Sequence, residues 1–357
     1  MTGISEKEIL ERLKTVLPSG IIPAVTMNDG HITIVVEVDP ARGRVMEPLR
    51  LAAENAVKAL PGVISTKVIL TAEKNSPPQK SAPKAVQHKV SSKPVAPHVR
   101  HIIAVASGKG GVGKSTVAAN LAAAFVRLGK KTGLLDADIY GASQPRMMGL
   151  RPKPETNDDD MIVPPEAHGL KIMSMGFFVD PLSPVIWRGP MVHSAIQQLL
   201  RDVAWGDLDV LVIDLPPGTG DAQLSLAQNV PLAGAVIVST PQDVALSEAK
   251  KGLLMFEKVG VPALGLIENM SYHVCANCGH TEHIFAHGGV REEAAKTGVP
   301  FLGEIPLHID LRTAADGGMP LVFAQEDHAI TKIFMETANA LWKRLQTRAA
   351  ASKAKSG

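Results

Sequence analysis

From residue 100 onward, short runs of apolar residues alternate with longer segments of helical periodicity. The runs have the length of buried strands and occupy residues 102–106, 132–135, 210–213, 235–239 and 263–267. Between them, apolar residues recur three or four positions apart, as they do over 117–128. Buried strands that alternate with helices are typical of a parallel sheet with helices on both faces. The pattern predicts an α/β domain with a doubly wound, mostly parallel sheet over residues 100–348.

The first seventy residues show the same two periodicities on a smaller scale. Ser5 and Glu8 fit a capping box, and the apolar residues that follow keep a helical spacing until Pro18. Three further elements are predicted: a strand over 32–38, a helix over 49–60 and a strand over 63–70. The sequence therefore predicts a small α/β domain over residues 1–72.

Two segments lack apolar periodicity. Residues 73–99 are rich in Pro, Lys, Ser and Gln, which favours a flexible linker. No acidic residue occurs between Glu73 and Asp136, so this linker is locally basic; we interpret it as a solvated spacer rather than a binding tail. Small and polar residues predict a disordered tail over 349–357.

Charge and composition give no sign of a nucleic-acid or membrane partner. The formal net charge is only +2, so the chain has no general attraction to polyanions. The N-terminus lacks a basic start followed by an apolar stretch, and no apolar segment is long enough to span a bilayer. We expect a cytoplasmic protein that binds neither nucleic acid nor membrane.

A glycine-rich segment separates the strand over 102–106 from the helix over 117–128. It reads Gly108-Lys109-Gly110-Gly111-Val112-Gly113-Lys114-Ser115-Thr116. This is the phosphate-binding pattern G-x-x-x-x-G-K-[ST] between a strand and a helix, where backbone N–H groups surround the phosphates. Lys114 then meets the β and γ phosphates, and the Ser115 hydroxyl binds Mg²⁺. We assign residues 108–116 to the binding of a nucleoside triphosphate, with Lys114 also in a catalytic role.

Carboxylates follow two of the predicted strands. Asp214 ends the strand over 210–213, which is the position of a magnesium carboxylate opposite a phosphate loop. In the loop behind it, Gly218 would offer a backbone N–H near the γ-phosphate. Asp136 and Asp138 follow the strand over 132–135, and we expect Asp136 to bind Mg²⁺ through water and Asp138 to orient the attacking water. The alternative is that both acids cap a helix or face solvent.

Lys109 is a second lysine within the phosphate loop, and the phosphates of one nucleotide do not obviously require its charge. If two subunits face each other across their nucleotides, Lys109 would reach the partner's phosphates and stabilise the charge of the transition state, as an arginine finger does. We therefore expect Lys109 to be catalytic in a dimer.

Several further motifs resemble those of one family. They are Asp136-Ala137-Asp138-Ile139-Tyr140-Gly141, Trp187-Arg188-Gly189-Pro190-Met191, Asp214-Leu215-Pro216-Pro217-Gly218-Thr219-Gly220-Asp221, Ser239-Thr240-Pro241-Gln242 and Glu268-Asn269-Met270-Ser271. Together with Lys109 in the loop, they resemble the deviant-loop P-loop ATPases and, within these, the Mrp (ApbC) iron-sulfur cluster carriers. The resemblance covers residues 100 to about 345, and residues 1–72 look like the small N-terminal domain of these carriers. This domain contains no cysteine here.

The resemblance implies a cluster carrier with weak ATP hydrolysis. Its cofactors would be ATP and Mg²⁺, with Asn269 at the adenine base. Cys275 and Cys278 would hold half of a [4Fe-4S] cluster between two subunits, and apo iron-sulfur proteins would accept the cluster.

Ligand counting supports a shared site. A tetrahedral zinc ion or a four-iron cluster takes about four protein ligands, and this chain has two cysteines, Cys275 and Cys278. A homodimer would supply four thiolates. An alternative stays open, in which one chain binds zinc through both cysteines and two of the nearby histidines, which are His273, His280, His283 and His287. In that case the chain would be a regulatory or positioning ATPase with a structural zinc site.

Overall fold

The computed structural model describes most of the chain, and the chain divides into two compact units, Met1–Val90 and Ser91–Gly357. The described residues are 6–16, 24–28, 31–37, 52–61, 63, 65–71, 95–151, 153–178, 189–275 and 277–356. Most of the predicted linker, and Trp187 and Arg188, lie outside them.

The N-terminal unit is a three-stranded sheet packed against helices. Its elements are α1 (Glu6–Lys14), β1 (Ala24–Asn28), β2 (His31–Glu37), a helix at residues 52–58 and β3 (Ser65–Thr71). The order is β1-β2-β3, with β2 antiparallel to β1 and parallel to β3. Apolar residues at helical spacing in α1 and at every second position of β2 form its core, which contains Ile9, Leu13, Ile32, Ile34 and Val36. Strand β1 was not predicted, because five residues at a sheet edge carry little periodic signal.

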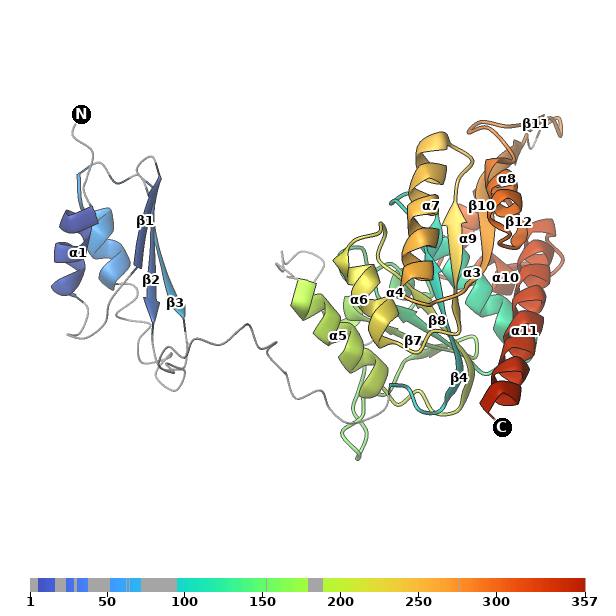
Figure 1. The fold of residues 1–357 in the computed structure, drawn as a ribbon, viewed down its shortest axis with the longest axis horizontal. Coiled ribbons are helices and arrows are strands. Elements are labelled where there is room, and N and C mark those ends of the chain that lie inside the picture. The colour runs from blue at the N-terminus through green and yellow to red at the C-terminus, as the bar shows by residue number, and fades with distance from the viewer. Residues whose placement is uncertain are drawn as a thin grey trace. The chain divides into compact units, whose positions relative to one another are not determined.

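The second unit contains a large, mostly parallel sheet (Figure 1). Its strands are β4 (Val99–Ala106), β5 (Thr132–Asp136), β6 (Glu166–Ala167), β7 (Leu170–Ser174), β8 (Leu208–Asp214), β9 (Gly234–Ser239), β10 (Ala263–Val274), β11 (Thr281–Glu282) and β12 (Phe301–Leu307). The order is β11-β10-β9-β4-β8-β5-β7-β6, and β12 pairs with β10. Only the two-residue strands β6 and β11 pair antiparallel. The predicted fold class is confirmed.

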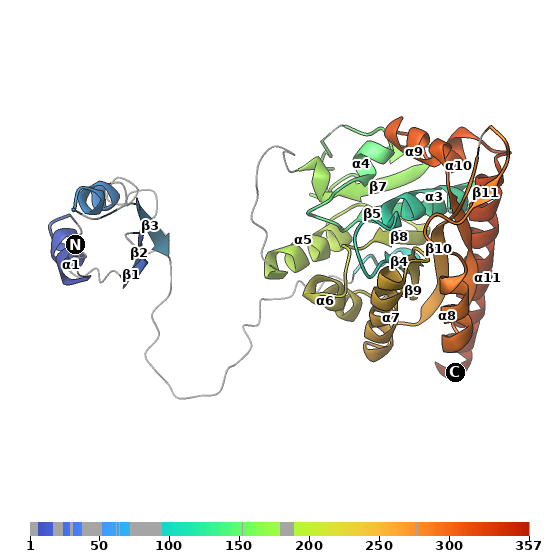
Figure 2. The ribbon, with the colours of Figure 1, turned by 90° about the horizontal axis from the view of Figure 1, so that it is seen from above.

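Helices cover both faces of this sheet (Figure 2). Their bounds are α3 (Lys114–Arg127), α4 (Gln144–Met147), α5 (Gly189–Arg201), α6 (Asp221–Asn229), α7 (Asp243–Lys258), α8 (Gly289–Thr297), α9 (Ile309–Asp316), α10 (Leu321–Ala324) and α11 (Ala329–Ser356). One core cluster joins the sheet to α3, α9, α10 and α11, and the other joins it to α5, α6, α7 and α8. Alternate residues of β4 enter opposite clusters, as Ile103 and Ala104 do, so the sheet is doubly wound.

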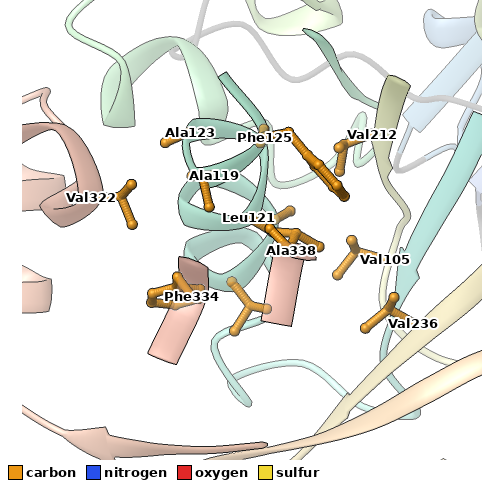
Figure 3. Close-up of a cluster of buried hydrophobic side chains, with 14 of the residues drawn as sticks. Val105, Ala119, Leu121, Ala123, Phe125, Val212, Val236, Val322, Phe334 and Ala338 are labelled. Carbon is orange, nitrogen blue, oxygen red and sulfur yellow. The ribbon is translucent and has the colours of Figure 1, made fainter. Parts of the chain in front are cut away.

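Helix α3 is the central helix of one face (Figure 3). Its alanines let it lie close to the sheet and α11, while Leu121 and Phe125 are fully buried. Burying a side chain of that size contributes about 1.5–3 kcal/mol. This packing fixes the start of α3, and with it the loop that precedes the helix.

Three predictions from the pattern differ from the structure. Strands β7 and β12 were not predicted, because their apolar runs are short and interrupted by Lys171, Gly303 and Glu304. The predicted disordered tail is wrong as far as Ser356, since α11 continues to that residue. Alanine and lysine, the main residues of this stretch, are strong helix formers.

None of the described helices is both long and apolar enough to cross a bilayer.

A buried histidine makes stability depend on pH. His101 is 7% exposed and lies edge-on to the ring of Trp342, at 5.7 Å between centroids. Burial, and secondarily the charge of Arg100, lowers its pKa from the ordinary 6.5. Below pH 6.5, His101 therefore binds a proton more readily in the unfolded chain than in the folded chain. The free energy of unfolding is highest above this pH and falls as the pH decreases.

We expect urea unfolding to show this loss between pH 7 and 5 and a shallower loss in His101→Phe, whose ring does not titrate. Groups common to both proteins cancel in the difference. Equal pH profiles would contradict the role assigned to His101.

Candidate functional site

The glycine-rich loop lies at the carboxyl end of β4 and leads into α3. Gly111 and Gly113 adopt left-handed φ angles of 82° and 80°, which favour glycine. A Cβ atom at Gly108 would lie 2.3 Å from the backbone of Glu248, and one at Gly113 would lie 2.2 Å from Nδ2 of Asn269. Local conformation and close approach thus both require these glycines, and the loop has the shape that binds phosphate.

Lys114 is buried in this structure and pairs with a carboxylate. Its Nζ donates to Oδ1 of Asp214, whose side chain is fully buried, and lies 3.2 Å from the Ser115 hydroxyl. The lysine and the two residues predicted to bind Mg²⁺ are therefore gathered at one point. A triphosphate would compete with Asp214 for Lys114. Once the lysine bound the phosphates, the Asp214 carboxylate would be free to bind Mg²⁺.

Asp136 holds the turn that follows β5. Its Oδ2 accepts hydrogen bonds from the backbone N–H groups of Ser143 and Gln144, at 2.9 and 3.0 Å, and from the Ser174 hydroxyl at 3.1 Å. Burial, reinforced by the neighbouring Asp214, raises the pKa of Asp136 to about 7. With these bonds in place, Asp136 supports the site by fixing the backbone. Its water-mediated role toward Mg²⁺ stays a prediction.

Asp138 lies two residues further on and is 9% exposed. Its Oδ1 accepts the backbone N–H of Gly141 at 3.1 Å. Burial raises its pKa, while the charge of Lys114 opposes that shift. Of these two acids at the end of β5, Asp138 accepts fewer side-chain hydrogen bonds, which fits the residue expected to orient water.

Lys109 lies within the loop, and Gly218 lies close to it. Lys109 is partly exposed, and its carbonyl accepts the Ser107 hydroxyl at 2.9 Å. Gly218 has a left-handed φ of 96°, and its N–H donates to the Ser107 carbonyl at 3.0 Å. The structure therefore brings Gly218 to the loop with its N–H already bonded. Contact with a γ-phosphate would require that bond to break.

A cavity of about 360 Å³ adjoins the loop. It is lined by Gly113, Thr116, Ser143, Arg146, Met147, Asn269, Met270, Pro306, Leu307, His308, Leu311, Arg312, Ala315 and Asp316. Cavities of this size and apolar character hold small ligands such as a nucleoside. Asn269 was predicted to meet adenine, and it borders this space while its Nδ2 donates to the Val112 carbonyl at 2.8 Å.

The cysteines lie on a hairpin at the end of β10. The backbone N–H of Cys275 donates to the His280 carbonyl at 2.9 Å, and β10 pairs with β11 beyond it. Cys275 is partly exposed, Cys278 is exposed, and both are free thiols. Hydrogen bonds from the backbone N–H of Cys278, and then of Asn277, lower the pKa of the Cys275 thiol. The hairpin thus favours a thiolate, which is the form that binds metal.

Strand β10 joins the two halves of the site. It contains Asn269, which contacts the glycine-rich loop, and ends one residue before Cys275. Between them, Met270 has a left-handed φ of 55°, and the pairing with β12 shifts register between Asn269 and His273. One strand with a local irregularity therefore runs from the loop to the thiols.

Among the described residues, the histidines are not gathered around the thiols. Two groups of three potential metal ligands occur in the described part of the chain. One is Glu268 with His287 and Glu304, and the other is His308 with Asp310 and His328. Neither contains a cysteine. In the first group, Glu304 is bonded to His287 and Arg291, and Glu268 accepts from backbone N–H groups. In the second, both histidines accept a backbone N–H through Nδ1.

The donor sets fit the expected groups. Ser115 and Asp214 offer oxygen atoms, the ligands that Mg²⁺ prefers. The amide oxygen of Gln144 beside them is buried and has no hydrogen-bond partner. Two accessible thiols suit an iron-sulfur cluster or zinc, and a second pair of ligands has to come from elsewhere.

Several residues of the site are not marked by any pattern in the sequence. Gln144 was not singled out, because a lone glutamine in a loop matches no pattern. The cavity residues after β12 were missed along with that strand, although Pro306 directly behind an apolar run was a usable signal.

The sequence matches two known families. Residues 98–342 match the ParA family, described as NUBPL iron-transfer P-loop NTPase. Residues 7–69 match a family described as iron-sulfur cluster assembly protein. The two matches fall in the two compact units.

Individual proteins agree with these matches. The iron-sulfur cluster carrier protein of Pseudomonas fragi is 50% identical over 285 residues, which are 79% of this chain and 96% of that protein. The mouse iron-sulfur cluster transfer protein NUBPL is 51% identical over 70% of this chain and 79% of its own length.

Among solved structures, a nucleotide-binding protein from Archaeoglobus fulgidus in complex with ADP has a TM-score of 0.58 at 39% identity, over 66% of this chain and 93% of its own. The MinD cell division ATPase of Pyrococcus furiosus, at 23% identity and a TM-score of 0.52 over 68% and 99%, shares the fold. The resemblance to Mrp-type carriers is confirmed, and this chain belongs to the ParA family of NUBPL-type iron-transfer P-loop NTPases.

Proposed function

We propose that this protein is an ATP-dependent carrier that holds a [4Fe-4S] cluster between two identical subunits and delivers it to apo iron-sulfur proteins. The observation that carries the proposal is the pair of free, accessible thiols, Cys275 and Cys278, on the hairpin that follows β10, a strand that also contacts the phosphate loop. The names of the relatives, iron-sulfur cluster carrier and transfer proteins, support the same cargo.

The thiol site supports a shared and labile cluster. A Cys₄ cluster needs four thiolates, and one chain supplies two. A cluster near solvent, with two ligands from each subunit, is exposed to attack by the thiols of an acceptor. Such a site suits transfer better than storage.

Exposed apolar side chains support a second copy as the partner. Tyr140, Val244, Val274, Ile284 and Ile309 are 36–68% exposed. Tyr140, Val244 and Ile309 follow the carboxyl ends of β5, β9 and β12, and Val274 is the last residue of β10, on the side of the sheet where the loop and thiols lie. Ile284 follows β11, the antiparallel strand of the cysteine hairpin. Exposed apolar groups around a site mark an interaction surface. Dimerisation there would bring Lys109 toward the partner's phosphates.

ATP hydrolysis would depend on groups around the loop. Lys114 and Lys109 would stabilise the charge that develops on the phosphates, and Asp138 would orient the attacking water. Mg²⁺, when bound, supplies the charge that neutralises the β and γ phosphates. A cytoplasmic location stays a prediction. For the zinc alternative, no group of three or more potential ligands among the described residues includes a cysteine.

Anaerobic reconstitution with iron and sulfide tests the function. We expect about four iron atoms per two chains in a dimer, and nucleotide-dependent transfer to an apoenzyme that requires [4Fe-4S]. A protein that stays monomeric under every nucleotide and metal condition, or that retains zinc and takes up no iron, contradicts the proposal.

A further inference from the structure

Gln144 connects the two residues that are assigned to magnesium. It is fully buried at the start of α4. Its Nε2 donates to the backbone carbonyl of Ser115 at 3.0 Å and to Oδ2 of Asp214 at 2.9 Å. The other oxygen of Asp214 accepts from Lys114. Asp214 is thus held by the lysine on one side and by the glutamine on the other.

The orientation of the amide group follows from these contacts. Both neighbours of Nε2 are oxygen atoms that only accept hydrogen bonds, so the nitrogen has to face them and the oxygen has to point elsewhere. Oε1 is buried and has no partner among the described residues. A buried acceptor without a hydrogen bond destabilises the folded protein. A donor is therefore expected at this position in the working protein.

The backbone holds Gln144 in place. Its own N–H donates to Oδ2 of Asp136 at 3.0 Å, and the neighbouring Ser143 N–H donates to the same oxygen. The Ser143 hydroxyl is also buried and has no partner in the described part of the chain, and Ser143 borders the cavity beside the loop. Two consecutive side chains, each with an oxygen atom that could still form a hydrogen bond, thus lie where the loop meets Asp214.

We propose that Gln144 is a positioning residue of the magnesium site. Its amide nitrogen keeps Asp214 and the main chain of Ser115 in place once Lys114 has moved to the phosphates. Its amide oxygen accepts hydrogen bonds from the water that surrounds Mg²⁺. The inference rests on the nucleotide-binding part of the proposed function and is independent of the cluster.

The test measures ADP binding by calorimetry in EDTA and across a MgCl₂ titration, on the full chain. Gln144→Leu keeps the volume and removes both polar atoms. We expect ADP affinity in EDTA to be unchanged, and the Mg²⁺ concentration at half-maximal effect to rise about tenfold, as is typical when a group behind a metal ligand is lost. Gln144→Glu keeps the oxygen but places a second oxygen where Nε2 faces Asp214 and the Ser115 carbonyl, so it should also raise the Mg²⁺ requirement.

Gln197→Leu is the matched control, because Gln197 on α5 is also buried and its Oε1 has no partner among the described residues. It should titrate like the wild type. The proposal is overturned if Gln144→Leu or Gln144→Glu matches this control, or if Gln144→Leu loses ADP affinity equally with and without Mg²⁺. Wild-type ADP binding that does not respond to Mg²⁺ would also overturn it, whereas a wild type that binds no ADP would overturn the nucleotide half of the proposed function.

Discussion

Replacing Cys275 and Cys278 by serine is expected to abolish cluster binding and to leave nucleotide binding intact. The chain has no other cysteine, so the double variant has no thiolate to offer iron. The thiols lie on a hairpin beyond the end of β10, and no core cluster contains them, so the fold should persist. Iron per chain after anaerobic reconstitution should fall to background, and ADP affinity should equal that of the wild type.

His280→Ala is the control for this experiment. His280 lies on the same hairpin and is exposed, and it contacts Cys275 through its backbone carbonyl, which the substitution retains. We expect full iron loading. Loss of metal in His280→Ala, or iron retained without the cysteines, would favour a different ligand set, such as zinc in a single chain.

Replacing Lys114 by methionine is expected to have two separable effects. ATP hydrolysis should fall by about 100- to 1,000-fold, since a group that stabilises charge in the transition state is lost. The nucleotide-free protein should also lose about 3–5 kcal/mol of stability, because Asp214 is fully buried and loses its partner charge. Steady-state hydrolysis and urea unfolding measure these effects.

A double variant distinguishes the two effects. In Lys114→Met with Asp214→Asn, both charges of the buried ion pair are removed, while the amide still accepts from Gln144. Most of the lost stability should return, and hydrolysis should stay as low as in the single variant. If the double variant is no more stable than Lys114→Met, the ion pair does not stabilise the folded protein.

The strands that carry the nucleotide site could be predicted because each is an unbroken apolar run followed by a polar motif. β4, β5 and β8 are buried on both faces, so their hydrophobicity shows without any partner. β7 and β12 lie nearer the edges of the sheet and contain charged residues or glycine, which hides them from a pattern of apolar residues. The end of α11 was missed because loss of apolar spacing does not preclude a helix of strong helix formers.

The candidate site likewise contains some residues that the sequence predicts and others that it does not. Lys114 and Asp214 stand in a motif or at a strand end, where sequence position alone implies proximity. Gln144 and the cavity residues after β12 reach the site through tertiary packing between segments remote in sequence. The Asp136 carboxylate was predicted to face magnesium; its actual bonds to the turn depend on backbone geometry that no residue pattern encodes.

The length of β10 sets the distance along the chain between the residue that contacts the phosphate loop and the thiols. From Asn269 to Cys275 the chain advances six residues, which span roughly 20 Å at about 3.3 Å per residue. Any rearrangement that displaces the Val112 carbonyl acts on Asn269 and is carried along a single backbone. The left-handed Met270 and the register shift beyond it interrupt the regular strand along this path. In the proposed carrier, a movement of the phosphate loop would therefore reach the thiols through one short stretch of covalent backbone.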